Sequence, residues 1–470
     1  MGNKTPLLLT DEQMRQFIAD GFLILQTDFS KEFHQSLIEQ LSYVYENEGN
    51  PGNNLLPRIR ELQQVFDHPV ITGALTSVLG PDYMLHAHRH GHFNAIPEAG
   101  GWHKDSYWGY SKMRNHHPWW AMIMYFPQDT PVELGPTGVM PGTQNYQTRT
   151  FVDNENKEEA LASGEAGTFA LIHYDIWHRS TPNVLGKARY MLKFEFMRTQ
   201  APTSPTWNQK EEAWKLPEQI KSPFRQQDTM WEETWNWLSG KLGSVANTAS
   251  ADAESVQQLA VELRDASEPN ALHAAYELAR TGTPGIEALL QGLLDDEAGV
   301  SRISAYGLSV SGVEAISGLT DALDHENLHT VMHAAFALGE QRELTSGAVS
   351  KLINLLQHPA PQVRYTAVES LGMLGKPSDA TIEGLIECLK DEDVQVRFTT
   401  GLSLSRLGAA AEAAVPQLQI ALDDENRYVR AHALEALRYI GTEDAKDALI
   451  KHLFNSRWCS NTTPQSTFYP

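Results

Sequence analysis

The stretch Gly100-Gly-Trp-His-Lys-Asp105 places His103 two residues before Asp105, directly after a pair of glycines. In extended backbone, residues i and i+2 point to the same face, so both side chains can reach one metal ion while Lys104 points away. Imidazole nitrogen and carboxylate oxygen are both common metal donors. The stretch therefore predicts a strand-like segment that supplies two ligands of a single metal site.

A second histidine stands at the end of the apolar segment Gly167–His178, whose composition predicts a strand. A turn-forming Thr181-Pro-Asn183 separates it from a further predicted strand, 188–196, which begins at Arg189. Such a hairpin would bring His178 and Arg189 to the same end of neighbouring strands. Two imidazoles and one carboxylate on one side of a metal are the ligand set of non-haem Fe(II) oxygenases. The planar charge of Arg189 suits a bidentate grip on a carboxylate that enters beside the metal.

The order of these elements is more specific than any one of them. After the His-x-Asp come a glycine-rich run at 135–143 and a Gly-Glu-Ala-Gly-Thr strand entry at 164–168, and then His178 and Arg189 eleven residues apart. In this order the elements resemble the phytanoyl-CoA dioxygenase family of Fe(II)/2-oxoglutarate oxygenases. The resemblance covers about residues 8–242 and implies a double-stranded β-helix (jelly roll) with flanking helices.

The same resemblance implies a role for each residue of the site. By this likeness His103, Asp105 and His178 bind Fe(II), and Arg189 holds the distal carboxylate of 2-oxoglutarate. Asn94, shortly before the His-x-Asp, is a further candidate neighbour of the cosubstrate. The implied reaction uses Fe(II), 2-oxoglutarate and O2 to hydroxylate a C–H bond of a small or medium-sized substrate, with release of succinate and CO2. Desaturation or cyclisation would use the same ligands, whereas the family's halogenating branch lacks the carboxylate.

Two further histidine patterns leave alternatives open. His173-Tyr-Asp175 repeats the His-x-Asp spacing, although no arginine follows it at a matching place. Four more histidines alternate along a predicted strand and would share one face, namely His86, His88, His90 and His92. This face either lines the barrel and its mouth or holds a second metal ion.

The densest aromatic and basic stretch of the chain, 106–120, follows Asp105 directly. A substrate with an apolar or ring-bearing body and a negative group would suit it. The candidate substrate-binding residues are Tyr107, Trp108, Lys112 and Arg114. In the alternative interpretation, Trp119 and Trp120 begin a core strand and the basic residues are solvated.

Composition limits the class of protein and its partners. With 470 residues the chain is long enough for two or three domains, and its formal net charge of −22 argues against nucleic acid and anionic membranes as partners. The chain has no apolar run long enough to span a membrane. Its two cysteines, Cys388 and Cys459, make no disulfide framework. We therefore expect a cytoplasmic protein that acts on a small-molecule substrate.

The second half of the chain repeats itself with a period of 33 residues. Val363-Arg364, Val396-Arg397 and Val429-Arg430 stand in the same frame of leucines, acidic residues and alanines. Such a period with two amphipathic helices per unit predicts a stacked α-solenoid. The units resemble HEAT-like repeats of the phycobilisome-lyase type. We expect the valines to pack between helices and the arginines to pair with acidic turns.

These observations predict a multidomain chain. Its parts are an oxygenase domain at 1–242, a small polar linker at 243–254, an all-α HEAT-like solenoid at 255–457 and a C-terminal tail at 458–470. The solenoid offers a surface for a protein partner or for self-association. The alternative function is an interaction scaffold with a vestigial jelly roll, and the complete ligand set speaks against it.

Overall fold

The computed structural model describes residues 5–105, 112–149, 151, 158–375 and 377–455. The chain divides into two compact units, Met1–Leu344 and Thr345–Pro470. The first unit holds two β-sheets and the first helices of the helical half, and the described residues of the second form helices and turns. No helix among the described residues is long and apolar enough to cross a membrane.

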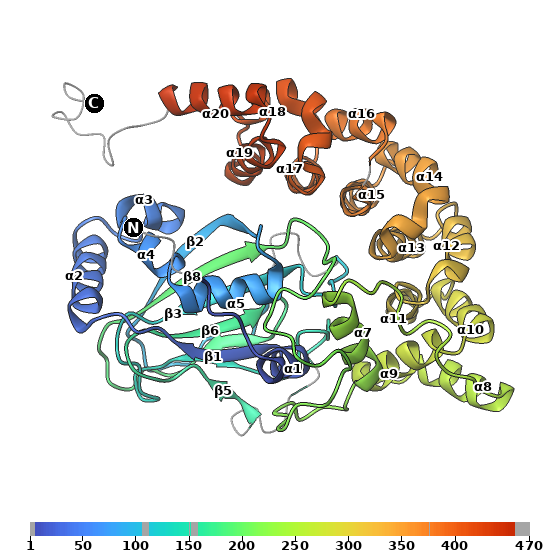
Figure 1. The fold of residues 1–470 in the computed structure, drawn as a ribbon, viewed down its shortest axis with the longest axis horizontal. Coiled ribbons are helices and arrows are strands. Elements are labelled where there is room, and N and C mark those ends of the chain that lie inside the picture. The colour runs from blue at the N-terminus through green and yellow to red at the C-terminus, as the bar shows by residue number, and fades with distance from the viewer. Residues whose placement is uncertain (1–4, 106–111, 150, 152–157, 376, 456–470) are drawn as a thin grey trace. The chain divides into compact units, whose positions relative to one another are not determined.

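A five-stranded antiparallel sheet forms the centre of the first unit (Figure 1). In spatial order its strands are β1 (Phe22–Gln26), β6 (Thr168–His173), β3 (Trp120–Tyr125), β8 (Arg189–Met197) and β2 (Met84–Asn94). β6, β3 and β8 are buried along their whole length. Strands buried on both faces need no polar alternation, which explains the nearly continuous apolar sequences of β6 and β3. β8 differs, because it carries Arg189, Lys193 and Glu195 on one face. The interpretation in which Trp120 begins a core strand is confirmed.

A smaller antiparallel sheet lies across a cavity from the larger one. Its strands, again in spatial order, are β5 (Ala160–Leu161), β4 (Thr137–Val139) and β7 (His178–Ser180). An antiparallel bridge between His103 and His178 continues this sheet beyond β7. Side chains from both sheets line the cavity between them.

Helices from the N-terminal part of the chain flank the larger sheet. They are α1 (Asp11–Asp20), α2 (Lys31–Asn47), the 3-10 turn η1 (Gly52–Asn54), α3 (Leu55–Arg58), α4 (Leu62–Phe66) and α5 (Pro69–Leu79). Figure 1 shows α1 and α5 on the same face of the sheet. Thr10 caps α1 in a capping box with Gln13, and Gly21 ends it at a φ of 79°. Thr10 and Gly21 thus set the two ends of α1.

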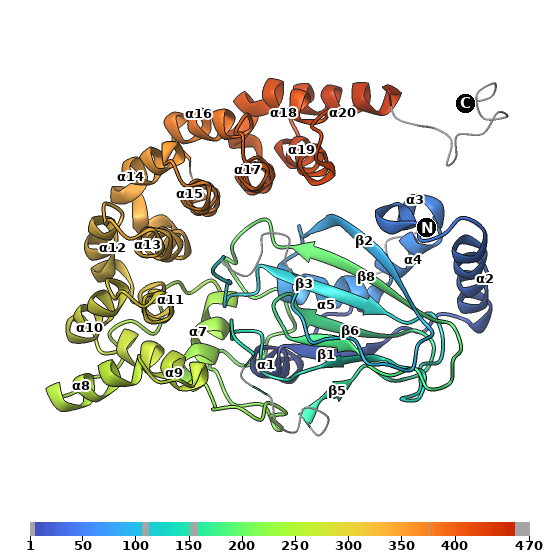
Figure 2. The ribbon, with the colours of Figure 1, turned by 180° about the vertical axis from the view of Figure 1, so that it is seen from behind.

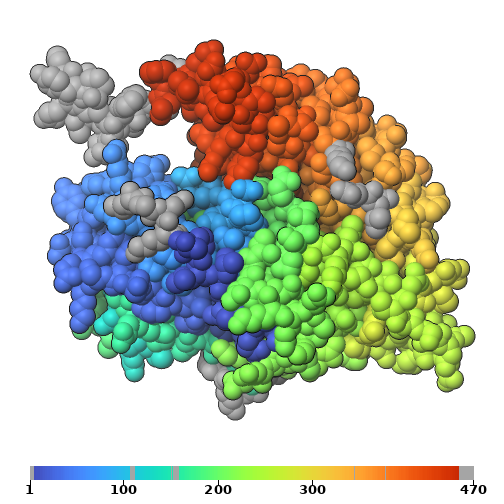
Figure 3. Space-filling model, in the orientation of Figure 1, coloured from blue at the N-terminus to red at the C-terminus, as the bar shows by residue number. Residues whose placement is uncertain are grey.

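Residues 199–242 wrap around the N-terminal helix and belong to the same core. Asp11 accepts hydrogen bonds from the indole of Trp207 and from two backbone amides that follow it. Asp20 accepts two more from the backbone of the same segment. The segment ends in α7 (Asp228–Leu238), whose tryptophans are all buried. In Figure 3 the green surface of this segment borders the dark blue N-terminal residues.

The helical half begins inside the first unit. Its elements there are α8 (Ala253–Glu262), α9 (Glu268–Ala279), α10 (Thr283–Leu293), α11 (Ala298–Leu308), η2 (Val313–Ala315), α12 (Ile316–Ala322), α13 (Leu328–Gln341) and η3 (Arg342–Ala348), the last of which crosses into the second unit. Figures 1 and 2 both show α7, α9 and α11 side by side. Within the first unit, the first repeats of the helical half therefore pack on the sheet-bearing half.

Buried polar side chains just before β3 carry this contact. The ring of His116 stacks on Tyr306 with 3.7 Å between centroids, and its Nδ1 lies 2.8 Å from the hydroxyl of Tyr276. Nδ1 of His117 lies 2.8 Å from a carboxylate oxygen of Glu340. The partners come from α11, α9 and α13 in turn. The interpretation in which the basic residues of this stretch are solvated is wrong, because Lys112, Arg114, His116 and His117 are all buried.

The predicted linker at 243–254 is packed against the rest of the first unit. Val245 is only 2% exposed, and Ser244 donates a hydrogen bond of 2.8 Å to Glu233 on α7. The boundary between the two compact units falls later in the sequence, after Leu344. The domain bounds read from the sequence on either side of the linker stay predictions.

The second unit continues the helical repeats. Its elements are α14 (Val349–Asn354), η4 (Leu355–Gln357), α15 (Pro361–Met373), α16 (Asp379–Cys388), α17 (Val394–Leu407), η5 (Gly408–Ala414), α18 (Val415–Ala421), α19 (Arg427–Ile440) and α20 (Glu443–Asn455). The valines of the 33-residue frame, Val363, Val396 and Val429, are buried between them.

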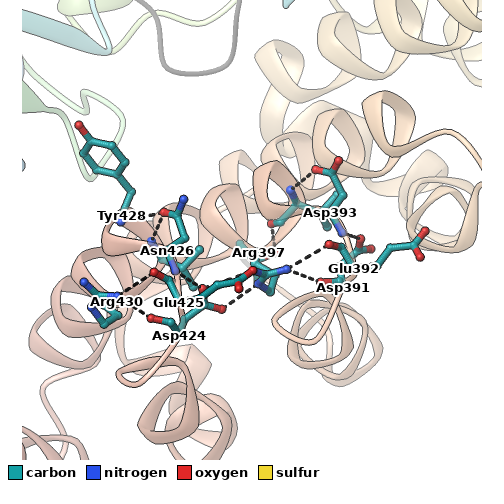
Figure 4. Close-up of polar contacts among 12 residues, drawn as sticks. Asp391, Glu392, Asp393, Arg397, Asp424, Glu425, Asn426, Tyr428 and Arg430 are labelled. Atoms are coloured by element: carbon teal, nitrogen blue, oxygen red, sulfur yellow. Dashed lines mark hydrogen bonds and ion pairs between the residues drawn. The ribbon is translucent and has the colours of Figure 1, made fainter.

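The arginines of the frame link successive repeats through the acidic turns. Arg364 grips the carboxylate of Asp391 with two hydrogen bonds of 2.7 and 2.8 Å, and Arg397 holds Asp424 in the same way at 2.8 and 3.3 Å. Each guanidinium also bonds to two backbone carbonyls of its own turn. Figure 4 shows the ladder at Arg397 and Arg430. The predicted pairing of these arginines with acidic turns is confirmed.

This ladder predicts the effect of removing one of its arginines. We expect Arg397→Ala to destabilise the second unit by about 2 kcal/mol, because two charge-assisted bonds and two carbonyl bonds are lost together. Hydrogen–deuterium exchange should speed up in α17 and in the turn at Asp424. The control is Arg427→Ala, since Arg427 is exposed and contacts its neighbour Tyr428. Equal exchange in the two variants would contradict the role given to the ladder.

Candidate metal centre

His103 and His178 lie opposite one another on neighbouring extended segments. Their main chains exchange two hydrogen bonds, each 3.0 Å from nitrogen to oxygen, and their ring centroids are 4.4 Å apart. Gly100 donates to the carbonyl of Ser180 further along the same pair of segments, at 2.9 Å. A Cβ at Gly100 would lie 2.5 Å from Oγ of Ser180, so any other residue there would require the serine side chain to move. β7 thus supplies one histidine and the segment paired with it supplies the other.

Asp105 completes the cluster two residues after His103. Its Oδ2 lies 3.2 Å from Nε2 of His178, and its Oδ1 lies 2.9 Å from Nζ of Lys193 on β8. One ligand atom from each of His103, Asp105 and His178 lies within 4.8 Å of the other two. Among the residues that the structure describes, no other group of three or more histidine, cysteine or acidic side chains brings its ligand atoms this close.

Hydrogen bonds orient both imidazoles toward a shared metal position. Nδ1 of His103 lies 2.9 Å from the carbonyl oxygen of Gly101, and Nδ1 of His178 lies 3.1 Å from that of Ile176. A carbonyl oxygen only accepts, so each Nδ1 carries the proton and donates it, and each Nε2 keeps its lone pair. Oδ2 of Asp105 is buried and makes no hydrogen bond. Two Nε2 atoms and one carboxylate oxygen are therefore available, a donor set that fits Fe(II).

The surroundings of the cluster favour the ligand forms of Asp105 and His103. Burial alone would raise the pKa of Asp105, but His178 and Lys193 beside it hold this pKa well below its ordinary value. Partial removal from water, together with the neighbouring His178, lowers the pKa of His103. An ionised carboxylate and neutral imidazoles are the protonation states that bind a metal ion.

A cavity of about 210 Å³ opens beside the cluster, between the two sheets. Its walls include both histidines of the cluster, Arg189 and Asn94, and apolar side chains such as Met124 and Met191. Apolar walls with a few convergent polar groups are typical of small-molecule sites. The structure thus brings five of the nine residues proposed from the sequence to one place, namely Asn94, His103, Asp105, His178 and Arg189.

Arg189 and Asn94 face each other across β8 and β2 at the inner end of this cavity. They are register partners, and both are buried. Nε of Arg189 donates a hydrogen bond of 3.0 Å to the carbonyl of Gly135. Nη1 of Arg189 and Nδ2 of Asn94 are both buried without a hydrogen-bond partner. Burial lowers the pKa of Arg189 to about 10, so its side chain stays positively charged at neutral pH. The pair offers a cation and an amide donor to an acidic ligand.

The sequence did not single out Lys193, which the structure places in the cavity wall against Asp105. Lys193 is 5% exposed and pairs in register with Met124 on β3. Its spacing of four residues from Arg189 on one strand puts both side chains on the same face. That spacing, in a strand that is otherwise largely apolar, is the sequence signal that could have identified Lys193 as a cavity residue.

The four alternating histidines of β2 lie along the inner side of the larger sheet. Nδ1 of His86 is 3.2 Å from one oxygen of Glu195, and Nε2 of His88 is 3.9 Å from the other. Burial lowers the pKa of His88 to about 4, which keeps it neutral. His92 lines the cavity. The strand thus agrees with the interpretation that this face lines the barrel.

His173, the alternative ligand, lies on β6 away from the cluster of three. It is buried, and its Nδ1 accepts a hydrogen bond of 3.2 Å from the backbone of Asp175. Burial lowers its pKa to about 4. The close group of ligand atoms contains His178 and not His173.

The predicted substrate-binding residues fall into two groups. Tyr107 and Trp108 lie outside the described residues. Lys112 and Arg114 are buried, and Nη1 of Arg114 lies 3.2 Å from a carboxylate oxygen of Asp175. The backbone amide of Arg114 donates to the hydroxyl of Tyr306 on α11. A role of these four residues in substrate binding stays a prediction, and Arg114 belongs to the contact with the helical half.

Solved structures resemble parts of this fold only distantly. A non-heme monooxygenase, ThoJ in a nickel complex, is 18% identical with a TM-score of 0.32, covering 44% of this chain and 89% of its own. The non-heme alpha ketoglutarate dependent carbocyclase SnoK from nogalamycin biosynthesis is 15% identical with a TM-score of 0.34, covering 44% and 97%. A designed armadillo repeat protein in complex with a (KR)4 peptide is 18% identical with a TM-score of 0.30, covering 40% and 99%. Scores this low carry no conclusion about activity. No curated protein matches the chain significantly.

Family comparison is more specific. The family described as phytanoyl-CoA dioxygenase (PhyH) matches residues 29–191, a span that contains the three clustered residues and Arg189. The HEAT repeat family matches residues 316–397 and 382–458. Together the two matches reproduce the order of parts expected from the motifs and from the 33-residue period. The chain therefore joins a segment that matches the phytanoyl-CoA dioxygenase family, and that carries the candidate metal centre, to a C-terminal series that matches HEAT repeats.

Proposed function

We propose that this protein is a non-haem Fe(II)/2-oxoglutarate-dependent dioxygenase that hydroxylates a C–H bond of a small or medium-sized organic substrate. The observation that carries the proposal is the convergence of His103, Asp105 and His178 at a cavity that also contains the buried cation of Arg189. In the proposed reaction one oxygen atom of O2 enters succinate as 2-oxoglutarate loses CO2, and the other enters the substrate as a hydroxyl group.

Each residue of the site would have a role in binding the metal, in binding the cosubstrate or in excluding water. Nε2 of His103, Nε2 of His178 and Oδ2 of Asp105 would hold Fe(II), which supplies the oxygen chemistry. Arg189 would hold the distal carboxylate of 2-oxoglutarate through its free Nη1, with Asn94 donating beside it. The apolar walls formed by side chains such as Met124 would keep bulk water from the reacting atoms.

Three finer assignments belong to this proposal. The two antiparallel sheets would be the halves of a double-stranded β-helix, with the cavity between them as its interior. The HEAT repeats would bind a protein partner or a second copy of the chain. We further propose a cytoplasmic location, to which the acidic composition and the lack of a disulfide framework conform. The scaffold alternative is disfavoured, because His103, Asp105 and His178 each bring one ligand atom to within 4.8 Å of the other two.

Uncoupled turnover tests the proposal without knowledge of the substrate. The purified protein with Fe(II), 2-oxoglutarate and O2 should form succinate slowly, and a small-molecule library should contain compounds that increase the rate. The Zn(II)-loaded protein is the matched control, because Zn(II) takes the same ligands without redox chemistry. Succinate formation that is equal with Zn(II) and Fe(II), or absent with Fe(II), would refute the proposed activity.

The cosubstrate role of Arg189 gives a separate prediction. We expect Arg189→Lys to raise the apparent KM for 2-oxoglutarate about 10- to 100-fold, because lysine keeps the charge and loses the two-pronged geometry. Metal affinity should stay unchanged. The control is Arg179→Lys, because Arg179 lines the same cavity but gives two hydrogen bonds of 2.8 and 2.7 Å to Glu159. A raised KM in the Arg179 variant alone would reassign the cosubstrate site.

A further inference from the structure

The buried ammonium of Lys193 divides the two oxygens of Asp105 between different partners. Nζ of Lys193 lies 2.9 Å from Oδ1, while Oδ2 faces Nε2 of His178 at 3.2 Å and makes no hydrogen bond. Lys193 is 5% exposed, and the side chain of Asp105 is 17% exposed. One oxygen is therefore occupied by a cation from β8, and the other points toward the histidines.

We propose that Lys193 is a positioning residue that restricts Asp105 to one metal-facing oxygen. The inference rests on the proposed function and extends it to a residue outside the ligand set. A carboxylate binds a metal ion through one oxygen or through both. An ammonium held at Oδ1 competes with the metal for that oxygen, because lysine donates only and has no acceptor of its own.

The number of coordination positions explains why this restriction matters. Three protein ligands on one face of a six-coordinate metal leave three positions, and 2-oxoglutarate needs two of them. A second oxygen from Asp105 would occupy one of the positions that the cosubstrate uses. Lys193 therefore favours binding of 2-oxoglutarate by keeping Asp105 to a single position.

A purely structural role for Lys193 predicts different behaviour. An ion pair that only stabilises the fold would, when broken, lower the melting temperature and weaken metal and cosubstrate binding together. A cation that acts on 2-oxoglutarate directly would change cosubstrate affinity and leave the coordination of Asp105 as it is. The positioning role alone predicts a change in how Asp105 coordinates, accompanied by weaker cosubstrate binding.

The test compares Lys193→Met, which removes the charge and the donor, with Lys193→Arg, which keeps both. Leu192→Met is the matched control, because Leu192 is the buried neighbour of Lys193 on β8 and points to the opposite face of the sheet, away from the residues that line the cavity. Lys193→Gln is one atom too short to reach Oδ1 and replaces the methionine variant if that variant does not fold.

Two measurements without turnover are needed. The first is the infrared difference spectrum between the Zn(II)-loaded and metal-free proteins, in which the two carboxylate stretches lie further apart for one-oxygen than for two-oxygen coordination. The second is the affinity of the Fe(II)-loaded protein for 2-oxoglutarate under anaerobic conditions. We expect Lys193→Met to narrow the separation between the two carboxylate stretches and to weaken 2-oxoglutarate binding about 10- to 100-fold, with Lys193→Arg and Leu192→Met close to wild type.

Each other outcome overturns the inference in a recognisable way. If the two carboxylate stretches stay far apart in Lys193→Met, Lys193 does not control how Asp105 coordinates the metal. This conclusion holds for any change in cosubstrate affinity. If the separation narrows and 2-oxoglutarate binds as tightly as in wild type, the restriction has no bearing on the cosubstrate. A wild-type protein that binds no metal would instead refute the proposed function itself, which separates the two failures.

Discussion

Replacement of His178 by alanine is expected to abolish Fe(II)-dependent 2-oxoglutarate turnover. The substitution removes one of three protein donors of the candidate metal site. The other two, His103 and Asp105, lie on one short segment, which a backbone bridge pairs with the strand of His178. We expect metal affinity to fall by more than about 100-fold, beyond the loss typical of a residue that merely supports a ligand. Isothermal titration with a divalent metal and succinate formation measure the two effects.

The matched control for this variant is His173→Asn. His173 stands five residues earlier, is equally buried, and offers the same ring. Asparagine keeps an acceptor near the backbone amide of Asp175, so the local turn should survive. We expect this variant to bind metal like the wild type. Loss of metal binding in the His173 variant together with full turnover in the His178 variant would reverse the ligand assignment.

Truncation after residue 242 is expected to destroy the fold of the sheet-bearing half, although the composition there resembles a linker. The cut removes Tyr276, Tyr306 and Glu340, which are the partners of the buried polar segment that leads into β3. The net stability of a domain is only about 5–15 kcal/mol, so the simultaneous loss of these contacts is decisive. We expect an aggregated protein or one that melts without a cooperative transition.

A chain that ends at Leu344 is the control for this truncation. It keeps the elements of the first compact unit through α13, ends within η3 and lacks the second unit. We expect it to melt cooperatively and to bind metal as tightly as the full chain. A 1–242 chain that folds cooperatively and binds metal with unchanged affinity would show that the oxygenase domain is independent, as the composition of the 243–254 segment suggests.

The parts that could be predicted from the sequence depend on local spacing. The i, i+2 relation of His103 and Asp105 follows from strand geometry, and the structure brings both to His178. The capping of α1 by Thr10 and the pairing of Arg364 and Arg397 with acidic turns are likewise local or strictly periodic. Such patterns need no knowledge of how distant segments pack.

The parts that could not be predicted depend on contacts between distant segments. The basic residues before β3 were open to two interpretations, because their partners Tyr276, Tyr306 and Glu340 come more than a hundred residues later. In the sequence Lys193 is an ordinary residue of a strand, because its contact with Asp105 depends on how β8 packs. The packing of the 243–254 segment is hidden for the same reason, since its small polar residues suit a loose linker equally well.

The most direct test of the central claim is the visible spectrum of the anaerobic protein with Fe(II) and 2-oxoglutarate. If His103, Asp105 and His178 hold the metal and Arg189 holds the cosubstrate, the wild-type protein should show the weak visible charge-transfer band of Fe(II) chelated by a 2-oxo acid. The band should be lost in His178→Ala, and in Arg189→Lys it should require a higher 2-oxoglutarate concentration. A wild-type protein that shows no band at saturating Fe(II) and 2-oxoglutarate, or a His178→Ala variant that keeps the band at full strength, would contradict the account.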